Sequence, residues 1–185
     1  MNKNVIIALI VGLVIGGLAW EMIRSDSWNV MMGPSSGSSI DRHFIEQMIP
    51  HHNDAITMAQ VALTRAKRPE IKTLASAIVT AQTKENNQMR TWYKEWYGQD
   101  VPIHMGIMHG GMMPGDADFS NLETSTDFDR DFIREMIPHH QMAVMMASML
   151  IGSIERPEMK KLSEDIIEAQ TSEIELMRGW YDEWK

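Results

Sequence analysis

Hydrophobic residues recur at three- and four-residue steps along two long stretches of the chain, residues 41–97 and 129–185. This spacing places them on one face of an amphipathic α-helix. An Arg-Pro-Glu sequence divides each stretch, and proline is well tolerated in the first turn of a helix. The pattern therefore predicts four helices, over residues 41–66, 69–97, 129–154 and 157–184.

The two stretches are copies of one another. Aligned at a constant offset of 88 residues without a gap, residues 41–97 and 129–185 share 28 identities in 57 positions. A hairpin of two helices cannot easily bury its apolar face alone, so the copies are expected to pack together. The predicted fold class is all-α, with duplicated helical hairpins forming a ferritin-like four-helix bundle, joined by a Met- and His-rich connection over residues 98–128.

Two local signals mark the first helix of each copy. Asp41 is a favourable N-cap residue at the predicted start of the first helix. Pro50 and its counterpart Pro138 fall inside the helical pattern, where proline removes a backbone hydrogen bond. We therefore expect a kink or a break at each proline.

An uncharged apolar segment precedes the repeat. Residues 1–24 contain a basic start at Lys3 and no charge between residues 5 and 20. This pattern is typical of a secretory signal peptide or of an N-terminal apolar helix that anchors the chain in the membrane through residues 5–23, and we favour the anchor. Residues 25–40 are rich in Gly and Ser and are expected to form a flexible tether. Both alternatives place residues 41–185 outside the cytoplasm, on the periplasmic or cell-surface side.

Composition narrows the classes of function. The 185-residue chain has a net charge of −8 and a pI near 5.3, which argues against a nucleic-acid partner. It has no cysteine, so disulfides and thiolate metal sites are impossible. It has 18 methionines. Any chemistry with soft metal ions must therefore use Met and His.

Soft and polar side chains fall on the face of the helices that the pattern predicts to be buried. On the first helix of each copy, a His and a Met lie inside the apolar stripe and another His and Met lie at its edge. These residues are Met48, His51, His52 and Met58, with Met136, His139, His140 and Met146 in the second copy. The second helices add Gln82, Glu85 and Met89, with Gln170, Glu173 and Met177.

Two interpretations of these side chains remain open. In the first, they form a polar layer in which each His bonds to a Glu or to a carbonyl freed by proline, and Met fills the core. In the second, neutral imidazoles and thioethers bind copper, with Cu(I) favoured because it is a soft ion.

Two further groups of soft side chains lie outside the predicted core. Residues 104–113 contain six soft ligands among glycines, and are predicted to be either a metal-binding loop or a Met-rich linker: His104, Met105, Met108, His109, Met112 and Met113. Met142, Met145 and Met149 lie opposite the core stripe of the third helix. This second group is either a partner surface or a metal-collecting face.

The repeated Met-Ile-Pro-His-His sequence, followed in each copy by Met-Arg-x-Trp-Tyr, resembles the domain-of-unknown-function-305 family of ferritin-like bundles. The resemblance covers nearly all of residues 41–185. The family includes exported copper-binding proteins of the CopM type, so the resemblance implies copper binding by the Met and His residues of the two repeated motifs. It also implies a copper-transport or acceptor protein as a partner.

The hypothesis is an extracytoplasmic protein that buffers, detoxifies or delivers Cu(I). One alternative is a metal-free structural or sensory bundle. A ferritin-like metalloenzyme is less favoured, because its Glu and Glu-x-x-His pattern is incomplete: Glu135 precedes His139 by four residues, and Gln47 stands at the matching position of the first copy.

Overall fold

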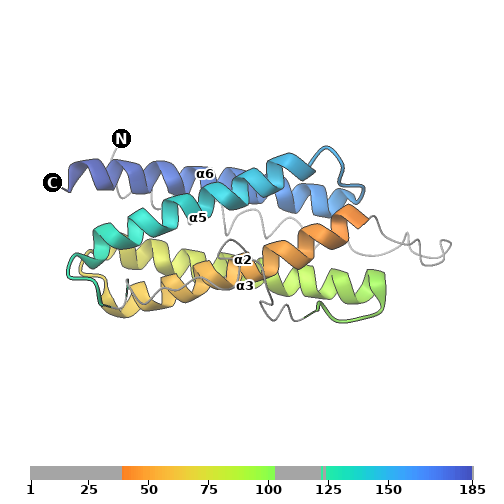
Figure 1. Cartoon of the computed structure of the whole chain (residues 1–185), viewed down its shortest axis with the longest axis horizontal. Coiled ribbons are helices and arrows are strands. Elements are labelled where there is room, and N and C mark those ends of the chain that lie inside the picture. Colours follow the sequence, from red (N-terminus) through yellow and green to blue (C-terminus); the bar gives the residue numbers. More distant parts are fainter. Residues whose placement is uncertain (1–38, 103–121, 123, 185) are drawn as a thin grey trace, which may run out of the picture. The chain divides into compact units, whose positions relative to one another are not determined.

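The four predicted helices are present in the computed structural model, which describes residues 39–102, 122 and 124–184. They are α2 (Ser39–Arg65), α3 (Pro69–Tyr97), α5 (Phe128–Leu150) and α6 (Pro157–Glu183). The predicted all-α fold of duplicated helical hairpins is confirmed (Figure 1). The predicted apolar helix, the tether and most of the Met- and His-rich connection lie outside the described residues.

The third helix ends earlier than predicted. It stops at Leu150, and residues 151–153 form a turn in which the backbone N–H of Ser153 donates to the carbonyl of Leu150 at 2.8 Å. Gly152 lies in this turn, and glycine has a low helix propensity, which the hydrophobic pattern does not register. Both prolines lie inside their helices, and neither α2 nor α5 is broken at them.

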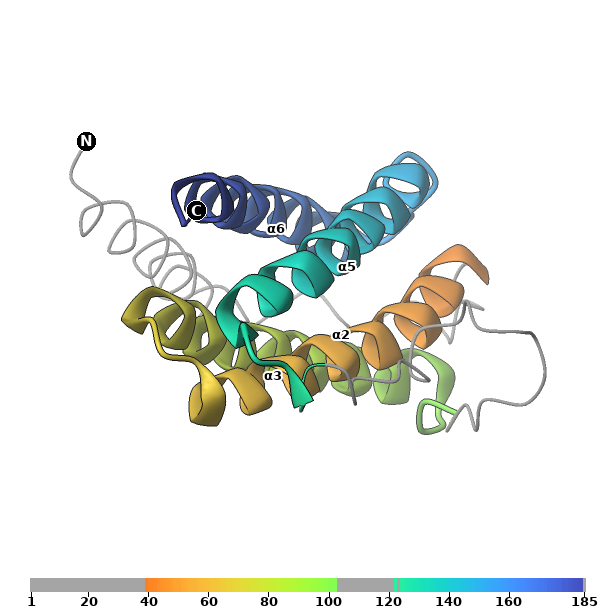
Figure 2. The same cartoon turned by 60° about the vertical axis from the view of Figure 1, so that its left-hand side comes forward.

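Each hairpin packs its two helices together, α2 against α3 and α5 against α6. The hairpins meet through α2 and α5, which run side by side in opposite directions (Figures 1 and 2). Phe44 and its copy Phe132 are both buried, as the stripe predicts. Phe44 lies in a buried apolar cluster that also contains Ala143, Ala147 and Leu162 of the second hairpin. Burying a phenylalanine contributes roughly 2–3 kcal/mol, so this cluster helps to hold the copies together.

The hairpins also exchange equivalent polar contacts. The Asp129 carboxylate accepts the backbone N–H groups of Lys67 and Arg68, both at 3.0 Å. In the other direction, Asp41 accepts the N–H of Glu155 at 3.4 Å and pairs with Arg156 at 3.5 Å. The prediction of Asp41 as N-cap is therefore wrong: α2 begins at Ser39, and Asp41 is buried against the opposite hairpin. Burial raises the pKa of Asp41.

Cation–π contacts complete these exchanges. The guanidinium of Arg68 lies 4.0 Å from the ring centre of Trp184, and that of Arg156 lies 4.2 Å from the ring centre of Trp96. In each case the arginine begins the second helix of one hairpin and the tryptophan ends the second helix of the other. The repeated Arg-Pro-Glu sequence thus serves contact between the copies as well as helix initiation.

Within the part of the chain that the structure describes, no helix is long and apolar enough to cross a membrane. The proposed anchor over residues 5–23 lies outside that part and stays a prediction.

Candidate metal centre

Two histidines meet where α2 packs against α5. The ring centres of His51 and His139 are 3.8 Å apart, and the rings are tilted by 40°. Each ring lies more than 6 Å from that of its chain neighbour, 6.4 Å to His52 and 6.3 Å to His140. Equivalent residues of two copies meet each other at a twofold axis. The repeated His-His sequence therefore brings four imidazoles to the middle of the bundle, which we call the histidine centre.

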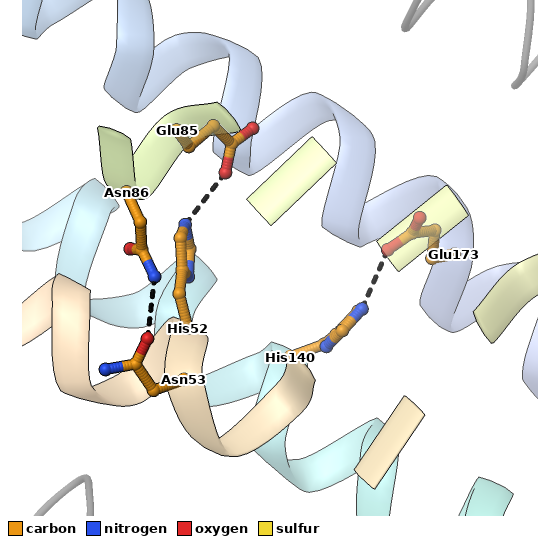
Figure 3. Close-up of polar contacts among 6 residues, drawn as sticks. All are labelled: His52, Asn53, Glu85, Asn86, His140 and Glu173. Atoms are coloured by element: carbon orange, nitrogen blue, oxygen red, sulfur yellow. Dashed lines mark hydrogen bonds and ion pairs between the residues drawn. The ribbon is translucent and has the colours of Figure 1, made fainter. Parts of the chain in front are cut away.

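His52 and His140 each form a hydrogen bond to a glutamate of the adjacent helix (Figure 3). Nε2 of His52 lies 2.8 Å from the Glu85 carboxylate, and Nε2 of His140 lies 2.7 Å from that of Glu173. Both histidines are buried, as the apolar stripe predicts, and each bonds to a Glu, which is one of the two partners that the polar-layer interpretation allows. A carboxylate accepts hydrogen bonds, so in the neutral tautomer that suits this contact Nε2 carries the N–H and Nδ1 the lone pair.

The remaining imidazole nitrogens of the histidine centre have no hydrogen-bond partner. Nδ1 of His52 and His140 and both ring nitrogens of His51 and His139 are buried without a hydrogen bond of normal geometry, although the backbone of His139 opposes part of the fall in the pKa of His51, and that of His51 does the same for His139. Buried polar atoms without a partner are costly and uncommon in proteins. Among the described residues, these six nitrogens form the largest group of unpaired buried side-chain atoms.

His51 and His139 are held in the neutral form. Burial, followed by the neighbouring imidazoles, lowers the pKa of His51 to about 3 and that of His139 to about 2. A neutral imidazole can bind a metal ion through its lone pair, whereas a protonated one cannot. The sequence places these two residues at the edge of the apolar stripe, and in the structure the buried His51 packs against the half-buried His139.

Four of the predicted thioethers lie on the same helices as the histidine centre, and the amides lie on the adjacent helices α3 and α6. Met48, Met58 and Met136 are buried, and Met146 is partly buried in the core. On α3 and α6, Met89 and Met177 are buried, as are Gln82 and Gln170, whose side-chain oxygens have no hydrogen-bond partner. Among the described residues, no three His, Asp or Glu side chains converge in a group that could hold a metal ion. A site in this region must therefore include thioethers or use few imidazoles.

The two copies differ beside the histidine centre. In the first copy, the buried Asn86 donates its Nδ2 to Oδ1 of Asn53 at 2.9 Å (Figure 3). Ile174 and Gln141 stand at the matching positions of the second copy. The helical pattern did not single out Asn86, although its alignment with a buried isoleucine was a signal that it faces the core.

Two other sequence predictions concern the Met- and His-rich loop and the carboxylate of Glu135. Residues 104–113, with their six predicted soft ligands, lie outside the described residues, and their role stays a prediction. Glu135 is exposed on α5. It therefore contributes no carboxylate to the interior, where a ferritin-like centre would need one.

The chain is similar in sequence and fold to proteins of known structure. CopM in the Cu(II)-bound form is 52% identical, with a TM-score of 0.74, and the match covers 78% of this chain and 97% of that chain. CopM in the Cu(I)-bound form is 50% identical, with a TM-score of 0.70, covering 78% and 96%. A CopM structure in an Ag-bound form matches at the same identity and coverage, with a TM-score of 0.69.

A curated relative and a family model complete the comparison. The uncharacterized protein L153 of Acanthamoeba polyphaga mimivirus is 43% identical over 51 residues, which are 28% of this chain and 34% of that protein. The match thus spans about a third of the length of that relative. The model of the domain of unknown function DUF305 matches residues 41–181. The chain therefore belongs to the DUF305 family.

Proposed function

We propose that this chain binds copper ions and that the histidine centre between α2 and α5 is its principal site. The observation that carries the proposal is the set of six buried imidazole nitrogens without hydrogen-bond partners. A neutral imidazole has one lone-pair nitrogen, so the four rings offer four lone pairs that a bound ion could satisfy. The similarity to CopM, solved with Cu(II), Cu(I) and Ag, supports copper as the ion.

The residues divide into ligands and supporting groups. His52 and His140 would bind through Nδ1, while Glu85 and Glu173 fix the orientation of their rings from the other side. A carboxylate that accepts the second N–H of a ligating histidine is a usual feature of metal sites. The remaining ligands would be His51 and His139 with the nearby thioethers Met48, Met58, Met136 and Met146.

Cu(I) is the oxidation state that this ligand set favours. Thioethers are soft ligands that select Cu(I), whereas imidazoles accept both copper states. The surroundings are buried and apolar, and a single positive charge costs less to bury than a double one. No three His, Asp or Glu side chains of the described helices form a metal-binding group, so the site would use few imidazoles, and completing it with thioethers would favour the same ion.

The proposed biological role requires only that the chain bind and release copper, without catalysing a reaction. The chain would buffer or deliver copper outside the cytoplasm, attached to the membrane through residues 5–23, and would exchange the ion with a copper-transport or acceptor protein. The loop over residues 104–113 would add capacity through His104, Met105, Met108, His109, Met112 and Met113. Neither role requires a catalytic residue.

Anaerobic loading of the full chain with Cu(I), followed by native mass spectrometry, tests the proposal. The variant H51L/H139L should bind fewer copper ions than the wild type, because it removes four of the six unpaired nitrogens. The control is H43D, which gives an exposed histidine the residue of the second copy, Asp131, and should leave the copper count unchanged. If the wild type binds no more Cu(I) than a helical bundle poor in Met and His, the metal-free structural bundle is the correct interpretation.

A further inference from the structure

Three methionines of α5 are exposed, although methionine is an apolar residue. The exposed fractions are 37% for Met142, 53% for Met145 and 73% for Met149. Among the described residues, Leu63 is the other large hydrophobic side chain exposed to this degree. We call the three residues the methionine stripe. A contiguous patch of exposed apolar side chains often marks an interaction or ligand-binding site.

The duplication shows that the fold does not need these methionines. The matching positions on α2 are Asp54, Thr57 and Val61, and α2 forms the corresponding helix without a methionine at any of them, although Asp54 is buried where Met142 is exposed. The stripe is therefore an addition to one copy. Its residues share thioether chemistry, and not only apolar character.

The methionine stripe is continuous with the histidine centre along α5. Met142 lies three residues after His139, and Met146 and Met149 follow at steps of four and three residues, spacings at which helix side chains are neighbours. At about 100° per residue, the stripe and His139 lie within an arc of about 120° on the helix surface. Within this arc Met142, Met145 and Met149 are exposed, whereas Met146 and His139 are half-buried. The buried His140 lies about 100° beyond His139.

We propose that the methionine stripe is a surface site for soft monovalent ions, Cu(I) and Ag(I), which receives the ion and passes it to His139. The inference rests on the proposed function, in which the histidine centre is the final binding site of the ion. In each transfer, one sulfur–copper bond breaks as a bond to the next sulfur or to an imidazole nitrogen forms, and copper remains Cu(I). Neighbouring soft ligands allow the ion to move without becoming fully hydrated.

The occupant of the stripe is the metal ion and not a protein. The chain carries a net charge of −8, which attracts cations to its surface. A surface evolved only for apolar docking would be served equally by leucine, which has a similar volume. Leucine also supplies the discriminating variant, because it keeps the apolar surface and removes the sulfur.

Stopped-flow transfer of Cu(I) from its bicinchoninate complex to the full chain tests the inference. The variant M142L/M145L/M149L should take up Cu(I) at least about tenfold more slowly, which corresponds to a barrier raised by about 1.4 kcal/mol. Its final occupancy of the histidine centre should equal that of the wild type. Circular dichroism should show an unchanged melting temperature, since leucine and methionine have similar helix propensities.

The equivalent positions on α2 allow a gain-of-function test, in which added thioethers should speed up Cu(I) uptake. The variant T57M/V61M introduces thioethers at the equivalent positions of α2 and should accelerate uptake, whereas T57L/V61L should not. Uptake by the triple leucine variant at the wild-type rate would overturn the inference and leave an apolar docking surface as the role of the stripe. A wild type that takes up no Cu(I) would instead overturn the proposed function and, with it, this inference.

Discussion

The two copies of the hairpin place the same histidine–glutamate pair in different surroundings. Glu173 has 7% of its side chain exposed, whereas Glu85 has 20%. The first copy adds a pair of asparagines beside its histidine, where the second copy has Ile174 in the core. The histidines therefore share a scaffold, but the second pair lies in a drier environment, where an unpaired charge costs more.

The contacts between the copies are also equivalent in kind and unequal in strength. Asp129 accepts two backbone N–H groups at 3.0 Å, whereas Asp41 accepts one at 3.4 Å and pairs with Arg156. A duplicated sequence thus fixes which residues meet, while later differences in neighbouring residues set how strongly they interact. Four predictions test how far the copies are equivalent.

The largest expected effect is a loss of stability in acid, shared equally by the copies. In the folded chain the pKa of His51 is lowered to about 3 and that of His139 to about 2. In the unfolded chain both histidines take up a proton near pH 6.5. Between about pH 6.5 and about pH 3 the unfolded chain therefore binds more protons than the folded chain. The free energy of unfolding should fall as pH falls, by about 1.4 kcal/mol per pH unit for each histidine, or about 4 kcal/mol for both from pH 6.5 to 5. Urea unfolding of the metal-free chain at pH 7, 6 and 5 measures it.

Single variants test whether the two histidines contribute equally. H51L and H139L should each remove about half of this pH dependence, since both pKa values lie below the pH range of the measurement. A pH dependence that is unchanged in either variant would show that the corresponding histidine is protonated in the folded chain. The equivalence of the copies at the axis would then be wrong.

The next effect separates the copies. H140A should cost about 3 kcal/mol of stability and H52A about 1 kcal/mol, because the first leaves the better buried glutamate without its partner. Chemical denaturation at pH 7 gives both values. The double variant H140A/E173L should recover part of the loss, since it removes the unpaired group together with its partner. Equal costs for the two single variants would contradict the difference in environment.

Much of the fold could be predicted because helical periodicity is a local property of the sequence. The burial of His52 and His140 and their pairing with Glu85 and Glu173 followed from positions on single helices. The meeting of His51 with His139 depends on which two helices pack at the twofold axis, and a helical wheel does not contain that information. The role of Asp41 was missed for the same reason: a cap is a local contact, and its actual partner is Glu155, in the other copy.

The contacts between the copies should show the third effect. D129A should destabilise the bundle by about 2 kcal/mol and D41A by about 1 kcal/mol, because Asp129 satisfies two backbone donors with shorter bonds. Thermal unfolding followed by circular dichroism compares them. D129N, which keeps one side-chain oxygen as acceptor, should lose less than D129A. A larger loss for D41A would mean that the ion pair with Arg156 outweighs the backbone bonds.

The smallest effect concerns the asparagine pair of the first copy. Asn86 is buried and its Oδ1 has no hydrogen-bond partner, whereas Asn53 is exposed and can bond to water when its partner is removed. N86I installs the residue of the second copy and removes an unsatisfied buried group, so it should stabilise the metal-free chain by about 1 kcal/mol. The reverse exchange, I174N, should destabilise it, because it places a polar amide in the core in place of the buried Ile174. Urea midpoints of the two variants decide the matter. If N86I instead lowers the free energy of unfolding, the hydrogen bond between Asn86 and Asn53 stabilises the first copy by more than the unpaired oxygen of Asn86 costs.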